Sequence, residues 1–154
     1  LISNCSNNFG PHQFEEKLIP LMITKIFNEE KLPIYGNGQN VRDWLFVEDH
    51  IDAIDLIFHK GTIGENYNIG GDNELKNIDV INELIIRIDK NLSRPKGYSK
   101  KLISFINDRM GHDYRYSINS NKLKKQLGWA PKTPFELGLD LTIDWYIKKL
   151  KKLN

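Results

Sequence analysis

Apolar side chains recur at helical spacing in several stretches of the chain. Leu18, Met22 and Ile26 follow one another at intervals of four residues, which predicts a helix over 15–30 whose first turn holds acidic residues. The same spacing predicts a second helix over 47–59, a third that begins at Asn77, a short one that contains Leu123 and Leu127, and a last one that begins at Pro134. Four apolar residues share one face of the second helix: Val47, Ile51, Ile54 and Phe58.

Short apolar runs between these helices predict strands over 32–35, 67–69 and 102–106. A turn is expected at 36–38, and residues 107–113 are polar and are expected to be irregular. Helices and short strands therefore alternate, but their spacing is irregular. This pattern predicts a small mixed α/β lobe rather than a complete doubly wound sheet.

The predicted helices carry signals at their ends. Asn77 is expected to be the N-cap of the third helix. Thr133 is expected to cap the last helix, with Pro134 in its first position and Glu136 completing a capping box. Gly128 is placed to end the short helix before it.

Composition narrows the classes of partner. The 154 residues fit one domain, or one lobe with part of another, and include 22 basic and 20 acidic residues. This balance argues against a nucleic-acid or membrane-surface partner. No signal peptide or membrane-spanning run is visible, so the chain is predicted to be cytoplasmic. Position 1 is Leu rather than Met, and we expect the chain to have been cut from a longer one.

The motifs of dinucleotide-dependent catalysis are missing from the sequence. Gly36-x-Gly38 lacks a third glycine and leads into no predicted helix, and no tyrosine is followed by lysine four residues later. The four histidines and Cys5 show no metal-ligand spacing. We therefore expect no metal site and no catalytic residue in this chain.

Three cations stand in polar segments that are predicted to be loops. Lys17, Arg42 and Arg109 are separated by long apolar stretches and could, together with a helix N-terminus at Asn77, neutralise a pyrophosphate. Each residue taken alone is more often structural, because an Arg followed by Asp is usually a surface ion pair. Spacing alone names no ligand.

Other polar groups suit a nucleotide sugar. Tyr35 stands beside a turn, where its ring could pack against a base. Asn7 and Asn8 can both donate and accept hydrogen bonds, as recognition of sugar hydroxyls or of a carboxamide requires.

The order of several motifs resembles a known family. SNNFGP, EKLIP, PIYGNG, VRDWLFVEDH, YNIGG, DRMGHD and LGWAPKTPFELGL occur in this order between about Cys5 and Tyr146. The set is similar to the extended short-chain dehydrogenase/reductase superfamily and, within it, to the dTDP-glucose 4,6-dehydratase family. YNIGG and LGW are shared by many sugar-nucleotide epimerases, whereas EKLIP, RDWLFVEDH and DRxGHD together are more specific.

This resemblance implies a fold and a domain assignment. Residues 1–154 would be the C-terminal substrate-binding lobe of an α/β extended short-chain dehydrogenase/reductase. Leu1 to about Gly10 would form a late strand and loop of the Rossmann sheet. The N-terminal half, which would hold NAD, the catalytic Tyr/Lys pair and an acidic pair, would be absent, so the chain alone is expected to be inactive.

The resemblance also implies residue roles. Asn8 would contact the cofactor NAD, and the remaining positions would contact the substrate, a nucleotide-diphosphate sugar such as dTDP-glucose. The substrate set is Asn7, Lys17, Leu18, Pro33, Ile34, Tyr35, Arg42, Asn77, Asp108, Arg109, Met110, Gly111 and His112. Met110 stands where the family usually has proline.

The implied reaction converts dTDP-glucose to its 4-keto-6-deoxy product in a deoxysugar pathway, and the intact enzyme would be a homodimer. Three alternatives stay open. SNNFGP also occurs in UDP-glucose 4,6-dehydratases, so the base is not fixed. A related epimerase or decarboxylase shares several motifs, and a non-catalytic sugar-nucleotide-binding module would also fit a chain without catalytic residues.

Overall fold

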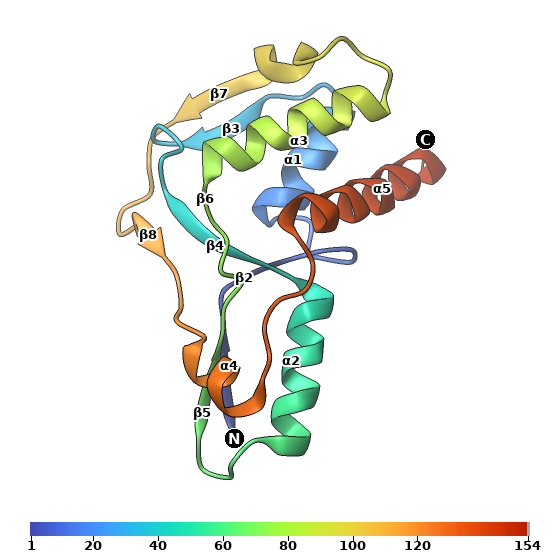
Figure 1. Cartoon of the computed structure of the whole chain (residues 1–154). Helices are drawn as coiled ribbons and strands as arrows, with labels where there is room; N and C mark the ends of the chain where they lie inside the picture. Colours follow the sequence, from blue (N-terminus) through green and yellow to red (C-terminus); the bar gives the residue numbers. More distant parts are fainter. Residues whose placement is uncertain (154) are drawn as a thin grey trace.

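A computed structural model describes the backbone of residues 1–153 and the side chains of residues 1–152. The molecule is elongated, with α1, α3 and α5 at one end and α2 and α4 at the other (Figure 1). The strands are β1 (Ile2–Cys5), β2 (Asn7–Phe9), β3 (Leu32–Tyr35), β4 (Val41–Phe46), β5 (Asn66–Ile69), β6 (Glu74–Lys76), β7 (Ile103–Ile106) and β8 (Arg115–Tyr116). The α-helices are α1 (Leu18–Phe27), α2 (Val47–Lys60), α3 (Asn77–Asn91), α4 (Asn121–Leu127) and α5 (Phe135–Leu153), and Tyr98–Leu102 forms a 3₁₀ helix.

The larger hydrophobic core lies between α1, α3 and α5. Its fully buried members include Ile23 of α1, Ile81 and Leu84 of α3, and Leu139 of α5. Strand β3 pairs in parallel with β7 at the outer side of this core, as Figure 1 shows. Burial of these branched side chains stabilises the end of the molecule that contains the start of α1 and the start of α3.

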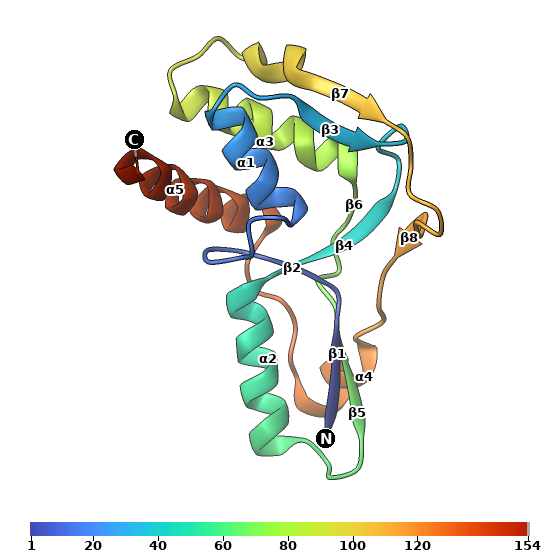
Figure 2. The same cartoon turned by 180° about the vertical axis from the view of Figure 1, so that it is seen from behind.

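The smaller core lies at the opposite end. Strands β1 and β5 form a parallel two-stranded sheet there, which Figure 2 shows beside α2 and α4. Tyr67 and Ile69 of β5, Ala53 of α2 and Leu123 of α4 are buried together. Parallel sheets normally have more strands and are covered on both faces, so this two-stranded pair resembles the edge of a larger sheet.

Strand β4 joins the two cores. It pairs in parallel with β2, antiparallel with β6 and in parallel with β8. Side chains alternate along a strand, and Trp44 and Phe46 accordingly enter the larger core while Leu45 enters the smaller one. One strand therefore fixes the orientation of the two ends relative to each other.

A buried carboxylate holds β4 against the loop after β5. Asp43 is only 1% exposed, and its two oxygens accept hydrogen bonds from the backbone N–H groups of Gly71 at 2.9 Å and Asn73 at 2.8 Å. Gly71 has to be glycine, because a Cβ there would lie 2.0 Å from the carbonyl oxygen of Trp44. The close approach and the two hydrogen bonds depend on each other.

The hydrophobic pattern predicted most elements correctly. The helix faces that contain Ile81, Leu84, Ile88 and Leu139 are buried, and the strands near 32–35, 67–69 and 102–106 are present. The α/β class and the absence of a complete doubly wound sheet are confirmed for the described residues. Gly128 ends α4 in a left-handed conformation, as expected.

Several boundaries were wrong. Helix α1 begins at Leu18 rather than residue 15, so no acidic residue lies in its first turn. Asn77 is the first residue of α3 and not its cap, which is Lys76. Helix α5 begins at Phe135, and the backbone N–H of Thr133 donates to Asp49 at its entrance.

The segment Val41–Trp44 was predicted to be a loop and is instead part of strand β4. Three further strands were not predicted: β2, β6 and β8. The shared apolar face of α2 is also exposed rather than packed, since Phe58 is 74% exposed and Ile51 and Ile54 are exposed too.

We predict that Asp43→Ala lowers the free energy of unfolding by about 3 kcal/mol, because two backbone donors lose a charged acceptor in a buried setting. Urea unfolding followed by circular dichroism measures this change. Asp52→Ala is the matched control, because Asp52 pairs with Lys132 on the surface and its loss should change stability little. Equal effects of the two substitutions would contradict the role given to Asp43.

Candidate functional site

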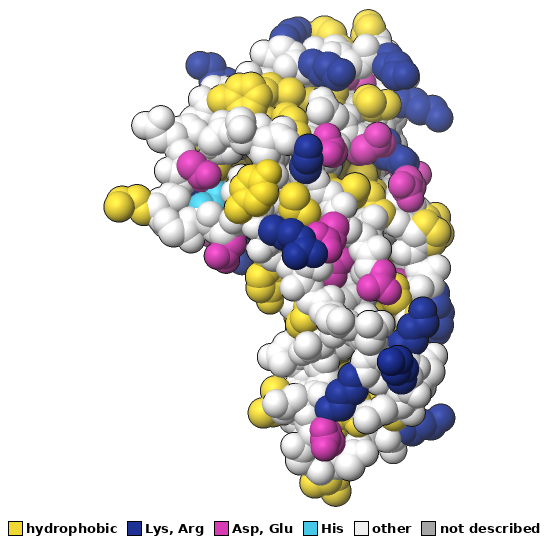
Figure 3. Space-filling model, turned by 60° about the vertical axis from the view of Figure 1, so that its left-hand side comes forward, with side chains coloured by type: hydrophobic (Ala, Val, Ile, Leu, Met, Phe, Trp, Pro, Cys, Tyr) yellow, Lys and Arg dark blue, Asp and Glu magenta, His cyan; other side chains and the backbone are white. Residues whose placement is uncertain are grey.

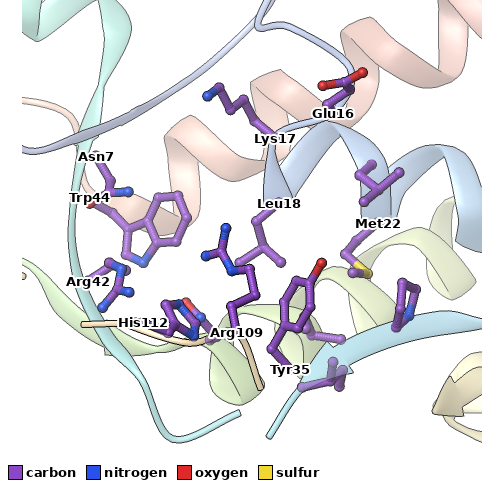
Figure 4. Close-up of a pocket in the computed structure, with 15 residues that line it drawn as sticks. Asn7, Glu16, Lys17, Leu18, Met22, Tyr35, Arg42, Trp44, Arg109 and His112 are labelled. Atoms are coloured by element: carbon purple, nitrogen blue, oxygen red, sulfur yellow. The ribbon is translucent and has the colours of Figure 1, made fainter. Parts of the chain in front are cut away.

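A cavity of about 350 Å³ lies where α1, α3, β3, β4 and the loop after β7 meet. Such a volume suits a small organic ligand. Ten side chains of this cavity are labelled in Figure 4, and its complete lining is Asn7, Glu16, Lys17, Leu18, Leu21, Met22, Pro33, Ile34, Tyr35, Arg42, Trp44, Asn77, Ile81, Arg109 and His112. These residues come from segments that are far apart in the sequence.

Cations outnumber carboxylates in the lining of the cavity. Lys17, Arg42 and Arg109 carry positive charge, whereas Glu16 is the one acidic side chain among the described lining residues. The Arg42 guanidinium donates to the backbone carbonyl of Asp113 at 2.8 Å and of its own neighbour Val41 at 2.7 Å. This fixes the guanidinium at the wall of the cavity and favours an anionic ligand.

Burial and neighbouring charges both act on the pKa of Arg42. Partial burial lowers the pKa of this guanidinium, and the nearby Arg109 acts in the same direction, whereas the carboxylates of Asp113 and Asp108 oppose the shift. An arginine nevertheless stays charged under all physiological conditions. Two guanidiniums that repel each other are both stabilised when an anion enters between them.

Tyr35 lies across the cavity from Arg42, and the guanidinium of Arg109 lies over the Tyr35 ring. The guanidinium carbon of Arg109 is 5.0 Å from the ring centroid, which is within the range of a cation–π contact. The His112 ring meets Tyr35 edge to face, with 6.2 Å between the centroids. Figure 4 shows these three side chains next to one another. The arrangement offers an aromatic surface beside a cation.

The loop that contains Arg109 is held by Asp108. The Asp108 carboxylate accepts from the backbone N–H of Arg109 at 2.8 Å and contacts His112 Nδ1 at 2.6 Å. The hydrogen bond with His112 lowers the pKa of Asp108 below its usual value. Asp108 also lies beside Gly36, where an added Cβ would come within 3.2 Å of its oxygen. Asp108 therefore positions Arg109 and His112 without lining the cavity.

Three buried polar atoms in the cavity lining have no hydrogen-bond partner. They are Asn7 Oδ1, Trp44 Nε1 and Asn77 Oδ1. Unpartnered buried polar atoms are uncommon in folded proteins and often mark a ligand site. The first backbone N–H groups of α3, by contrast, are already used, because Asn77 donates to Asn40 and Ile78 donates to Gly38. Helix α3 can therefore contribute to anion binding through its dipole and the Asn77 side chain, rather than through these two amides.

The structure brings most of the residues in the predicted substrate set together. Ten of them line this one cavity: Asn7, Lys17, Leu18, Pro33, Ile34, Tyr35, Arg42, Asn77, Arg109 and His112. Three do not line it: Asp108 is an exposed residue of the loop that contacts Arg109 and His112, Met110 is fully exposed, and Gly111 stands in open space. The predicted cofactor residue Asn8 lies on the other face of β2, where its Nδ2 donates to Ser6 and contacts Cys5 Sγ.

Five lining residues were not predicted: Glu16, Leu21, Met22, Trp44 and Ile81. Spacing could have identified most of them. Leu21 and Met22 follow Leu18 at helical intervals, and Trp44 follows Arg42 by two positions on a strand. The four residues other than Glu16 are apolar or aromatic, as core residues usually are, and the sequence alone therefore did not single them out.

Other kinds of site are less well supported. No group of three or more potential metal-binding side chains is found in the part of the chain that the structure describes. None of its described helices is long and apolar enough to cross a membrane. Basic side chains are spread from end to end of the face shown in Figure 3 and do not gather into one patch.

Comparison with known proteins identifies the family to which this chain belongs. Residues 1–142 match a family model described as GDP-mannose 4,6 dehydratase. A dTDP-glucose 4,6-dehydratase of Xanthomonas campestris pv. campestris strain B100 is 49% identical over 148 residues, which are 96% of this chain and 42% of that protein. The chain thus spans less than half the length of this relative.

Solved structures agree with the sequence comparison. A dTDP-glucose 4,6-dehydratase of Bacillus anthracis in complex with NAD has a TM-score of 0.84 and 49% identity over 97% of this chain and 45% of its own. DesIV, a dTDP-glucose 4,6-dehydratase of Streptomyces venezuelae solved with NAD, has a TM-score of 0.87 and 38% identity over 98% of this chain and 44% of its own. The resemblance drawn from the sequence motifs is confirmed, and this chain belongs to the GDP-mannose 4,6 dehydratase family.

Proposed function

We propose that this chain binds a nucleotide-diphosphate sugar, with dTDP-glucose as the first candidate, and forms the substrate-binding part of an NAD-dependent 4,6-dehydratase. The observation that carries the proposal is the single cavity that collects three cations, an aromatic ring and unpartnered polar atoms from distant segments. Its lining combines charge for a diphosphate with apolar surface for a base and amides for a sugar.

The diphosphate would lie between Arg42 and Arg109. Both guanidiniums line the cavity, and their mutual repulsion makes an anion between them favourable. His112 adds a ring nitrogen on the same side, and its other nitrogen is already held by Asp108. The charge of the ligand would thus be matched by side chains whose positions are fixed before binding.

The base would lie against Tyr35. Pro33 and Ile34 precede this tyrosine on β3 and also line the cavity. Arg109 covers one side of the Tyr35 ring at 5.0 Å, so the ring offers its remaining surface to a planar ligand. The edge-to-face contact with His112 further restricts how the ring can turn.

The sugar would face the start of α1 and strand β2. Lys17 is the residue before α1 and Leu18 is its first residue, so both project from a fixed helix end. Asn7 of β2 supplies an amide oxygen that is buried and unpartnered, as recognition of a sugar hydroxyl requires.

The proposed reaction of the complete protein converts dTDP-glucose to dTDP-4-keto-6-deoxyglucose and releases one molecule of water. NAD, when bound, supplies hydride transfer from the sugar and back to it. One residue of this chain fits NAD, namely Asn8. Its Oδ1 is buried without a partner and could accept a hydrogen bond from the carboxamide of NAD. We propose that the remaining NAD contacts and the catalytic groups come from outside these 154 residues, and that the chain alone does not catalyse the reaction.

Its part in catalysis would be positioning. A sugar held at both its diphosphate and its hydroxyls has few orientations left, and fixing reacting groups in this way contributes substantially to rate acceleration. UDP-glucose stays the second candidate ligand, because the SNNFGP motif also suits UDP-glucose 4,6-dehydratases. The two ligands differ in base and pentose, which face the Tyr35 side of the cavity.

We predict that the chain binds dTDP-glucose and that Arg42→Ala and Arg109→Ala each weaken binding by about 1–3 kcal/mol, since each removes a charge-assisted contact. Isothermal titration calorimetry with dTDP-glucose and with UDP-glucose measures the affinities and the preferred base. Arg115→Ala is the matched control, because Arg115 pairs with Glu74 outside the cavity. An unchanged affinity in a folded Arg42 or Arg109 variant would argue against the diphosphate site.

We predict that His112→Ala raises the pKa of Asp108, because the hydrogen bond between them is the main cause of its lowering. A lowered pKa means that the contact is present at neutral pH and is lost as the pH falls through the Asp108 pKa. Carbon-detected NMR of the Asp108 carboxyl against pH measures this in both proteins. Identical titration curves would show that His112 does not form this hydrogen bond with Asp108.

We predict that a polypeptide corresponding to the remaining length of the relatives restores dehydratase activity when it is produced together with this chain. That polypeptide would bind to β1 and to the exposed apolar face of α2, which includes Ile51 and Phe58.

Formation of the 4-keto product is measured in the mixture of the two polypeptides. Light scattering tests the proposed homodimer of the complete protein. Association without activity would contradict the proposed function, and Phe58→Asp should prevent association if this face is the contact.

A further inference from the structure

One buried donor in the cavity is not explained by the roles assigned above. Trp44 is 5% exposed, lines the cavity, and has an indole N–H without a hydrogen-bond partner. Buried tryptophan nitrogens usually find an acceptor, because an unsatisfied donor loses its hydration without compensation. Trp44 was not among the residues predicted to contact the substrate.

The position of Trp44 is set by the sheet. Parallel pairing of β2 with β4 places Trp44 directly opposite Asn7, and strands in a sheet lie about 4.8 Å apart. Arg42 precedes Trp44 by two residues on β4, and both side chains line the cavity. Figure 4 shows Trp44 between Asn7 and Arg42 along one wall. The indole therefore stands between the amide proposed for the sugar and the guanidinium proposed for the diphosphate.

The indole ring is held in place by packing. Its centroid lies 6.2 Å from that of Phe9 in an edge-to-face contact, and both rings belong to the larger core. The Trp44 backbone is fixed as well, because its N–H donates to Asn73 and its carbonyl touches Gly71. Turning the ring to reach another acceptor would disrupt this packing. Asn7 Oδ1, on the residue opposite, is also unpartnered and makes no hydrogen bond with Nε1, so we assign the acceptor to a ligand oxygen that enters the cavity between these two lining residues.

We infer that Trp44 is a further substrate-binding residue, whose indole N–H donates a hydrogen bond to an oxygen of the bound nucleotide-diphosphate sugar. The inference rests on the proposed function and adds a residue to it. The oxygen belongs either to the phosphate next to the sugar or to the sugar itself, since both lie between the Asn7 and Arg42 positions. In either case Trp44 provides a neutral donor of fixed direction, which a flexible lysine would not.

Solution NMR of the chain tests this directly. The protein contains three tryptophans, so its ¹⁵N spectrum should contain three indole N–H cross peaks, which Trp129→Phe and Trp145→Phe assign by elimination. Titration with dTDP-glucose is expected to shift the Trp44 indole proton downfield in a saturable manner. Trp129 is the internal control, because its Nε1 is also buried and unpartnered but lies outside this cavity.

Affinity provides the second measurement. Trp44→Phe keeps an aromatic ring and removes the donor, and we expect it to weaken dTDP-glucose binding about tenfold, whereas Trp129→Phe leaves binding unchanged. Repeating both titrations with dTDP locates the acceptor. A loss seen with both ligands assigns it to the phosphate, and a loss confined to dTDP-glucose assigns it to the sugar.

The outcomes separate this inference from the proposed function. Binding of dTDP-glucose with no shift of the Trp44 indole, or with unchanged affinity in a folded Trp44→Phe variant, overturns the inference and leaves the function intact. Absence of any cross-peak shift with dTDP-glucose contradicts the function and the inference together. If Trp44→Phe does not fold, the titration of the unmodified chain still decides the question.

Discussion

The alternation of side chains along β4 is the constraint on which this structure depends. Arg42 and Trp44 point into the cavity, while Asp43 and Leu45 point toward the other end of the molecule. Asp43 lies between the two cavity residues in sequence and accepts two backbone hydrogen bonds on the opposite face, so it holds the strand in this orientation. A shift of one residue in register would reverse both faces at once.

The cavity becomes a site because other segments end beside this strand. Helix α1 begins with Leu18, helix α3 begins with Asn77, and the loop after β7 brings in Arg109. Helices α1 and α3 are fixed by their packing in the larger core, and Asp108 holds the loop through the backbone amide of Arg109. Arg109 therefore lies against the Tyr35 ring, and Arg42 is held by two backbone carbonyls, before any ligand enters.

The sequence predicted the helices and the main strands because apolar residues recur in them at regular spacing. It did not predict β4, because Val41–Phe46 mixes charged and apolar residues without alternation and is largely buried on both faces. Asp43 looks like a surface residue until its backbone partners are known. Convergence of Lys17, Tyr35 and Arg42 could be expected from family resemblance alone, and Trp44 was missed because a buried aromatic residue usually belongs to the core.

The central claim is that this cavity is a preformed site for a nucleotide-diphosphate sugar. A crystal structure of the chain with dTDP-glucose tests it most directly. The account predicts a diphosphate between Arg42 and Arg109, a thymine ring against Tyr35, and side chains that have moved little from the positions described above. An ordered ligand elsewhere on the protein, or a cavity that stays empty at saturating ligand concentration, would contradict it.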